Sequence, residues 1–288
     1  MKTIKLFTAV LALTMVSQLP AKSQEVASKA LARVDRRDMR PFGEREGQTK
    51  EFKFKVPGSP EQYTLKVSNL QTDITFEAYS GTELVITALD YEGIPEKAKG
   101  LKPLSATGPD NTEIGLNIKT EGNVISLSGA GKAASDSDYI IKMPTAMGLS
   151  YEQESWHGGG DFVVKGLSGE INVQSKNSDI ILTDVSGPIV ANTVSGDINV
   201  VFGKLNATKP TSLAATSGDI DITMPSDAKV NFKLSVVSGE IYTDLDLKFA
   251  EKEGLKSWGG MNANPTFNGG GVEISLRAVS GDIFLRKK

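Results

Sequence analysis

A short phrase indicates the fold of this chain, and it reads VSGDINV at residues 194–200. Its core, Ser-Gly-acid-Ile, returns along the second half of the chain. The copies start at residues 168, 186, 195, 217, 238 and 280, with a degenerate copy, NSDI, at 177. The first four starts in chain order, 168, 177, 186 and 195, lie nine residues apart. Such fixed-period self-similarity is typical of repeat proteins, in which each unit buries its apolar side against its neighbours.

The phrase predicts a corner followed by a short strand. Ile198 and Val200 point to one face of that strand and Asn199 to the other, and we expect Val194 to share the inner face. Glycine permits a bend that a side chain would obstruct. Because nine is odd, a corner in each copy is needed to bring the same face inward again. The residues expected to build the structural repeat are Gly169, Ile171, Gly187, Ile189, Gly196, Ile198, Gly218, Ile220, Gly239, Ile241, Gly281 and Ile283.

These features predict an all-β fold, a single-stranded parallel β-helix or β-solenoid with about 18–22 residues per coil. Two nine-residue units would make a coil of 18. The gap of 42 between the starts at 238 and 280 is twice 21, and we expect it to hold one coil that has lost its phrase. The chain ends with Arg286, Lys287 and Lys288, whose charge would protect an exposed C-terminal sheet edge.

The start of the chain has the features of a secretory signal peptide over residues 1–23. Lys2 and Lys5 precede an apolar run at 6–16, and small residues at 21–23 suit cleavage before Gln24. Residues 24–50 form a charged N-terminal segment, and the β-solenoid is expected over 51–288. Its early coils, 51–155, are irregular. Its later coils, 156–288, carry the phrase and are interrupted by an excursion at 246–271.

Composition excludes several classes of function. Cleavage after residue 23 removes three lysines and no acids, so 29 of 32 basic residues remain against 35 acids, a net charge of about −6. That balance argues against a nucleic-acid partner. The chain has no cysteine, so disulfides, thiolate metal sites and a lipid-attachment cysteine are absent. No apolar run after the signal peptide is long enough to be a transmembrane segment.

The phrases resemble a known family. VSNL at 67–70, followed by DITFE at 73–77 and a turn containing Gly81, is similar to the opening coil of the bacterial putative-adhesin family. The Ser-Gly-Asp-Ile phrases between 168 and 283 are the most visible feature of that family. The resemblance covers about residues 50–288 and implies an exported β-strand-repeat protein of unknown function, with no catalytic residues to carry over. Pro188 and the NSDI copy depart from the pattern.

Few residues suggest chemistry. His157, the only histidine, precedes a glycine-rich stretch, and we expect a loop residue there because one histidine without cysteines cannot make a typical zinc site. If the corners stack, their acids could form columns that attract Ca²⁺; otherwise each acid bonds the backbone of its own turn. These weak calcium candidates are Glu170, Asp197, Asp219, Glu240 and Asp282. Trp156, Tyr242, Trp258 and Phe284 could form a carbohydrate platform, although packing under loops is the expected use.

The sequence therefore predicts a non-catalytic exported cell-envelope protein, adhesin-like in binding or scaffolding through an elongated β-solenoid surface. Its partner would be an envelope protein or a glycan, with no cofactor. One alternative is a carbohydrate-active enzyme, a polysaccharide lyase or hydrolase on a parallel β-helix, which would need clustered acids. The other is a periplasmic protein-binding envelope-stress factor. Neither the oligomeric state nor the choice between periplasm and cell surface follows from the sequence.

Overall fold

The computed structural model describes residues 47–68, 70–93, 95–98, 100, 101, 105, 108–156, 160–249 and 260–288. The expected signal peptide lies outside the described residues, as do His157 and Trp258. All elements below belong to one compact unit, Glu46–Lys287. No helix in the described ranges has the length and apolar character needed to cross a membrane.

Strands are the main secondary structure of the described residues, and helix is almost absent. Its helical elements are η1 (Pro60–Gln62), η2 (Glu96–Ala98) and α3 (Ala133–Asp136). The strands are β1 (Gln48–Lys55), β2 (Thr64–Ser68), β3 (Ile74–Tyr79), β4 (Glu83–Tyr91), β5 (Leu116–Glu121), β6 (Val124–Gly129), β7 (Asp138–Pro144), β8 (Gly148–Gln153), β9 (Phe162–Lys165), β10 (Ile171–Ser175), β11 (Ile180–Val185), β12 (Ile189–Ser195), β13 (Ile198–Phe202), β14 (Thr211–Ser217), β15 (Ile220–Met224), β16 (Val230–Ser238), β17 (Ile241–Thr243), β18 (Met261–Ala263), β19 (Thr266–Phe267), β20 (Val272–Ser280) and β21 (Ile283–Lys287).

The strands form two sheets. The ten-stranded sheet has the order β1-β4-β7-β3-β9-β11-β13-β15-β21-β17, and the eleven-stranded sheet has the order β18-β16-β20-β14-β12-β10-β8-β2-β6-β5, with β19 beside β16. From β2 onward the chain repeatedly lays one strand in the eleven-stranded sheet and the next in the ten-stranded sheet, and we call each such pair a rung. Neighbouring rungs pair in parallel, whereas β1, β4, β5, β18 and β19 pair antiparallel at the ends.

Each rung turns alternate side chains into one core. In β13 the inward residues Ile198, Val200 and Phe202 are buried, and the residues between them are half-buried. The phrase isoleucines at 171, 180, 189, 198, 220 and 283 are all fully buried. Ile241 is only half-buried, because β17 is the last strand of its sheet. The prediction for Val194 is wrong: it is 37% exposed, because the corner falls between it and Ile198 and reverses its direction.

The nine-residue period comes from two corners per rung. SGD at 195–197 leads from the eleven-stranded to the ten-stranded sheet, and SGE at 168–170 leads back. Later rungs keep the phrase only at the first kind of corner. At Gly218 a Cβ atom would lie 2.0 Å from the carbonyl oxygen of Gly196 in the next rung, and φ is +156°. Glycine is therefore required because the backbones of stacked corners approach closely.

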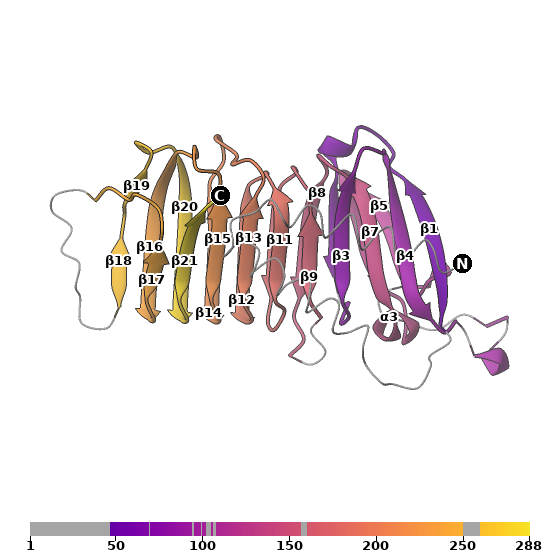
Figure 1. Ribbon diagram of the computed structural model, residues 1–288. Coiled ribbons are helices and arrows are strands. Elements are labelled where there is room, and N and C mark those ends of the chain that lie inside the picture. The colour runs from indigo at the N-terminus through magenta and orange to yellow at the C-terminus, as the bar shows by residue number, and fades with distance from the viewer. Residues whose placement is uncertain are drawn as a thin grey trace, which may run out of the picture. The chain divides into compact units, whose positions relative to one another are not determined.

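The last rung is inserted into the stack rather than added to its end. β20 and β21 lie between the rung β14–β15 and the rung β16–β17, as Figure 1 shows by the yellow strands between two orange pairs. The gap of 42 holds β17, β18 and β19, of which β18 and β19 pair antiparallel with β16, so its described residues form no further parallel rung as the expected extra coil would. The strand order also removes the role predicted for Arg286, Lys287 and Lys288, because β21 is an interior strand and β17 forms the edge. The rung β2–β3 is inserted in the same way between β6–β7 and β8–β9.

Candidate functional site

The corner acids form a hydrogen-bonded ladder along one border of the ten-stranded sheet. The backbone N–H of Asp282 donates to Oδ1 of Asp219 at 2.8 Å, and the N–H of Asp219 donates to Oδ1 of Asp197 at 2.9 Å. Further links join Asp197 to Asp179 at 3.0 Å and Glu240 to Asp282 at 2.8 Å. Four carboxylates therefore accept an amide of a neighbouring rung, those of Asp179, Asp197, Asp219 and Asp282, whereas Glu240 joins the ladder through its own amide.

A second run of the same ladder lies in the early rungs. Asp161 donates its N–H to Oδ1 of Asp73 at 3.0 Å, and Asp73 donates to Oδ1 of Asp138 at 3.3 Å. Asp73 and Asp161 directly precede the first residue of a strand, as the phrase acids do, and Asp138 is the first residue of its strand. None of the three follows a Ser-Gly pair that would have marked it in the sequence. Asp179 of the NSDI copy belongs to the ladder too. All the acids of the ladder share one sequence signal, which is an acid directly before or at the start of a strand of the ten-stranded sheet.

Four of the five calcium candidates lie in this ladder, and Glu170 does not. Glu170 lies at the opposite kind of corner, where its Oε2 pairs with Nζ of Lys209 at 2.9 Å, and both side chains are exposed. Within the described residues no group of three or more His, Cys, Asp or Glu side chains is arranged to hold a metal ion. The ladder uses its carboxylates as backbone acceptors, and this is a structural use of the repeat acids.

A cluster of aromatic and charged side chains covers the outer face of the ten-stranded sheet at its β17 end. The rings of Tyr242 and Phe284 stack with centroids 5.3 Å apart and an interplanar angle of 12°. The Arg286 guanidinium lies 5.3 Å from the centroid of the Phe284 ring, and its Nε donates to Oδ1 and Oδ2 of Asp221 at 2.9 and 3.0 Å. The Tyr242 hydroxyl donates to Oε2 of Glu240 at 2.8 Å.

Register explains why this cluster forms. Tyr242, Phe284 and Asp221 each follow the isoleucine of a phrase and are paired across β17, β21 and β15. The inserted last rung places Phe284 between the other two, so the cluster depends on the strand order. The sequence marks these as outward positions, but it does not indicate which of them are neighbours.

The other aromatic residues do not join this cluster. Trp156 is 57% exposed, and Lys176 lies over its ring with Nζ 5.6 Å from the centroid. Tyr242 is 47% exposed. The expectation that loops cover these rings is therefore wrong for Trp156 and Tyr242, and of the three candidate aromatics that the structure describes, Tyr242 and Phe284 stack together.

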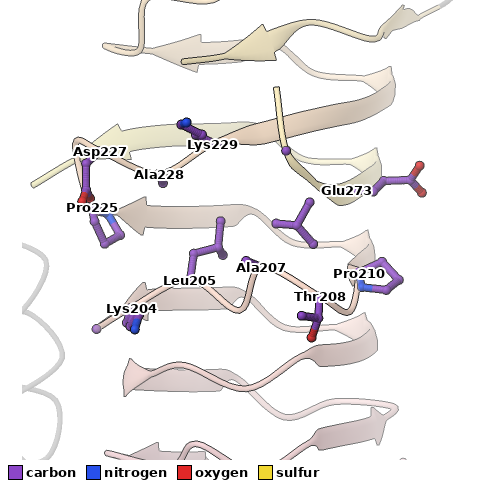
Figure 2. Close-up of a pocket in the computed structure, with 13 residues that line it drawn as sticks. Lys204, Leu205, Ala207, Thr208, Pro210, Pro225, Asp227, Ala228, Lys229 and Glu273 are labelled. Carbon is purple, nitrogen blue, oxygen red and sulfur yellow. The ribbon is translucent and has the colours of Figure 1, made fainter. Parts of the chain in front are cut away.

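A hollow of about 960 Å³ opens where the return corners lose their phrase. Its floor includes Leu205, Pro225 and Val272, and Asp227 and Glu273 are among its charged residues. Figure 2 shows Asp227 and Glu273 at opposite sides of this hollow. Glu273 is already paired with Lys233 at 2.8 Å. Asp227 and Glu273 are the acids among the residues that line this hollow, and one of the two is therefore held in an ion pair.

A family model matches the part of the chain that holds most of the parallel rungs. Residues 159–286 match the family model described as Toastrack DUF4097. The part of the chain that carries the Ser-Gly-acid-Ile phrases is therefore similar to a Toastrack DUF4097 domain, in agreement with the family resemblance drawn from those phrases. No curated protein matches the chain.

Several solved structures are similar. One is a putative cell adhesion protein from Clostridium sporogenes, at 11% identity and a TM-score of 0.45, covering 84% of this chain and 100% of its own. Another is a putative adhesin from Bacteroides fragilis, at 16% identity and a TM-score of 0.38, covering 84% and 97%. A third is a putative lipid binding protein from Parabacteroides distasonis, at 14% identity and a TM-score of 0.29, covering 83% and 97%.

Proposed function

We propose that the chain is an exported, non-catalytic cell-envelope protein that binds or scaffolds a partner through the outer surfaces of its stacked rungs. In this proposal the rungs form an open β-solenoid with two strands per coil. Export rests on the charged, apolar and small-residue start of the sequence.

One observation carries the proposal, namely the parallel register of the eleven-stranded sheet. It pairs outward residues of successive strands, so that Asn172, Val190, Ser212 and Ser275 stand in one row across four rungs. A row of short outward side chains at the strand spacing presents several contact points in line to a partner. Repetition of weak contacts raises avidity without requiring a deep pocket.

The geometry of the acids favours binding over catalysis. Four of the corner acids are acceptors for backbone amides, and Glu273, one of the two acids that line the hollow, is paired with Lys233. A general acid and a base or nucleophile for glycoside cleavage must flank one bond.

The test is a binding experiment with the purified protein on a solid support, exposed to envelope extracts and to a glycan array. We expect saturable retention of an envelope component, with no release of sugar products from polysaccharides. Product release that disappears in the Asp227→Asn or Glu273→Gln variant would favour the enzyme instead. N-terminal sequencing of the protein from its host should begin at Gln24, and an intact Met1 on the folded protein would contradict export.

A further inference from the structure

The two sheets end differently at the β16–β17 rung. In the eleven-stranded sheet the outer side of β16 is paired with β18 and β19. In the ten-stranded sheet β17 pairs with β21, and no second strand among the described residues pairs with its other side. An edge strand whose outer side is paired by no described strand presents backbone donors and acceptors to which an extended segment can add.

Tyr242 stands on this edge in a fixed orientation. One face of its ring stacks on Phe284, and its hydroxyl is held by Glu240, yet the side chain remains 47% exposed. A ring held on two sides loses little conformational freedom when a ligand covers it, so binding to it costs little entropy.

The neighbouring strands show what such a ring binds in this molecule. On Phe284 lies the cation Arg286, which is neutralised by Asp221 of the adjacent strand. Tyr242 repeats the ring one strand further out, and the carboxylate beside it is that of Glu240, two residues before it in the chain. The hydrogen bond to Glu240, together with the charges of Glu240 and Asp282, raises the pKa of Tyr242, so the surroundings of this ring are negative. A cation over the ring would match that charge.

We propose that β17 is the docking strand for an extended segment of a partner protein that carries arginine or lysine. The segment adds to the edge as a strand and lays one cationic side chain on the exposed face of Tyr242, beside Glu240. This inference rests on the proposed function and names the chemistry of its partner. A neutral sugar would stack on the ring without using the β17 backbone or the charge of Glu240.

The experiment uses the full protein and a fluorescent ten-residue peptide in which arginine and threonine alternate. One control peptide replaces arginine with the neutral isostere citrulline, and a second carries N-methyl groups on alternate residues, which block strand pairing. The protein variants are Tyr242→Ala, Tyr242→Phe and Glu240→Gln. Trp156→Ala is the matched control, because it removes another exposed aromatic ring, over which Lys176 lies. Thermal melting checks that each variant is folded.

We expect the arginine peptide to bind and both control peptides to bind at least tenfold more weakly. Tyr242→Ala should weaken binding by roughly threefold to thirtyfold, the range of a cation–ring contact. Tyr242→Phe should stay within about twofold, since the ring face is kept. Glu240→Gln should weaken binding and reduce its dependence on salt, and Trp156→Ala should change nothing.

Equal binding of the citrulline or N-methyl peptide would overturn the inference, as would full binding by Tyr242→Ala. Binding of neutral chitohexaose that depends on Tyr242, with no binding of the arginine peptide, would assign the ring to glycans instead. If envelope material is retained by both the wild type and Tyr242→Ala while the peptide is not bound, the inference fails and the proposed function stands. If nothing from the envelope or the glycan array is retained, the proposed function itself fails.

Discussion

At the corner aspartates, one carboxylate oxygen satisfies a backbone amide that belongs to the next rung. Asp219 illustrates the arrangement, because it accepts from Asp282 and donates its own amide to Asp197. An amide left unpaired at a half-buried position costs more free energy than the hydrogen bond contributes on average. The presence of an aspartate in the phrase is therefore explained by the backbone amide of the next rung, which its carboxylate accepts, and not by a ligand.

The first prediction concerns this ladder. Asp219→Ala should lower the free energy of unfolding by about 1–3 kcal/mol, because the Asp282 amide loses its acceptor. Asp219→Asn keeps an oxygen acceptor and should cost less. Urea unfolding measures both, with Asp227→Ala as the control on an exposed loop, expected within about 0.5 kcal/mol of wild type. Equal losses for Asp219→Ala and Asp227→Ala would contradict the ladder.

A second prediction concerns a buried tyrosine. Burial raises the pKa of Tyr151 to about 12, above the ordinary value of about 10. Its neutral form is favoured in the folded protein, so this stabilisation is complete below pH of about 10 and is lost as the pH rises toward about 12. In that window Tyr151→Phe should reduce the slope of stability against pH by about 1.4 kcal/mol per pH unit. Urea unfolding between pH 8 and 12 gives the slope, and identical slopes would refute the prediction.

For single residues, the sequence predicted which side chains point into the core better than it predicted which side chains contact one another. The buried isoleucines follow from alternation within short strands, which is local information. Val194 was misplaced because the corner lies between it and Ile198, and the odd spacing indicates a corner in each copy without showing which residues stand on either side of it. The Tyr242–Phe284 stack was unpredictable, because it joins residues from strands whose order in the sheet differs from their order in the chain.

Among the elements, the corners set how closely the rungs stack. Gly218→Ala would place a methyl group against the Gly196 carbonyl and force an unfavourable φ. We expect a loss of about 2–5 kcal/mol, from overpacking of about 1–3 and backbone strain of about 1–2. Gly122→Ala is the control, since φ there is +57° with nothing within 4 Å of the added atom, so it should lose only the strain. Thermal and urea unfolding measure the free energy of unfolding of both variants. A loss of stability in Gly218→Ala no larger than in Gly122→Ala would rule out the close approach of the corner backbones.

The column of acids allows a test of calcium binding. Because the carboxylates already accept amides, we expect millimolar Ca²⁺ to shift the melting temperature no more than sodium chloride of equal ionic strength. Calorimetry with chelator, with calcium and with matched salt makes the comparison. A rise specific to calcium and lost in Asp219→Asn would show that the ladder binds the ion after all.

The corners were the part of the fold that the sequence predicted best, because glycine and an inward isoleucine recur there for local steric reasons. The sequence did not reveal the loops that replace the return corners at 203–210 and 225–229, which line the hollow. These two loops do not carry the Ser-Gly-acid-Ile phrase, so their relative position depends on how the later rungs stack.

Over the unit Glu46–Lys287, the strand order differs from the chain order at both ends. The final rung enters between two earlier ones, and β17 is thereby left at the edge of the ten-stranded sheet. Repeat spacing alone cannot reveal such an insertion, because a gap of 42 fits a lost coil equally well. The proposed docking strand exists only if the insertion is correct.

Cross-linking tests this order most directly, and the chain is suited to it because it has no cysteine. Ser275 pairs with Ser212 on one side and with Lys233 on the other, all on the outer face. Neighbouring strands lie about 4.8 Å apart, within disulfide reach, whereas strands two apart lie about 10 Å apart and beyond it. Cysteine pairs at 212 and 275 and at 275 and 233 should therefore oxidise readily, and the pair at 212 and 233 should not. Rapid cross-linking of 212 to 233, with none between 212 and 275, would contradict the inserted rung and remove the open edge at β17.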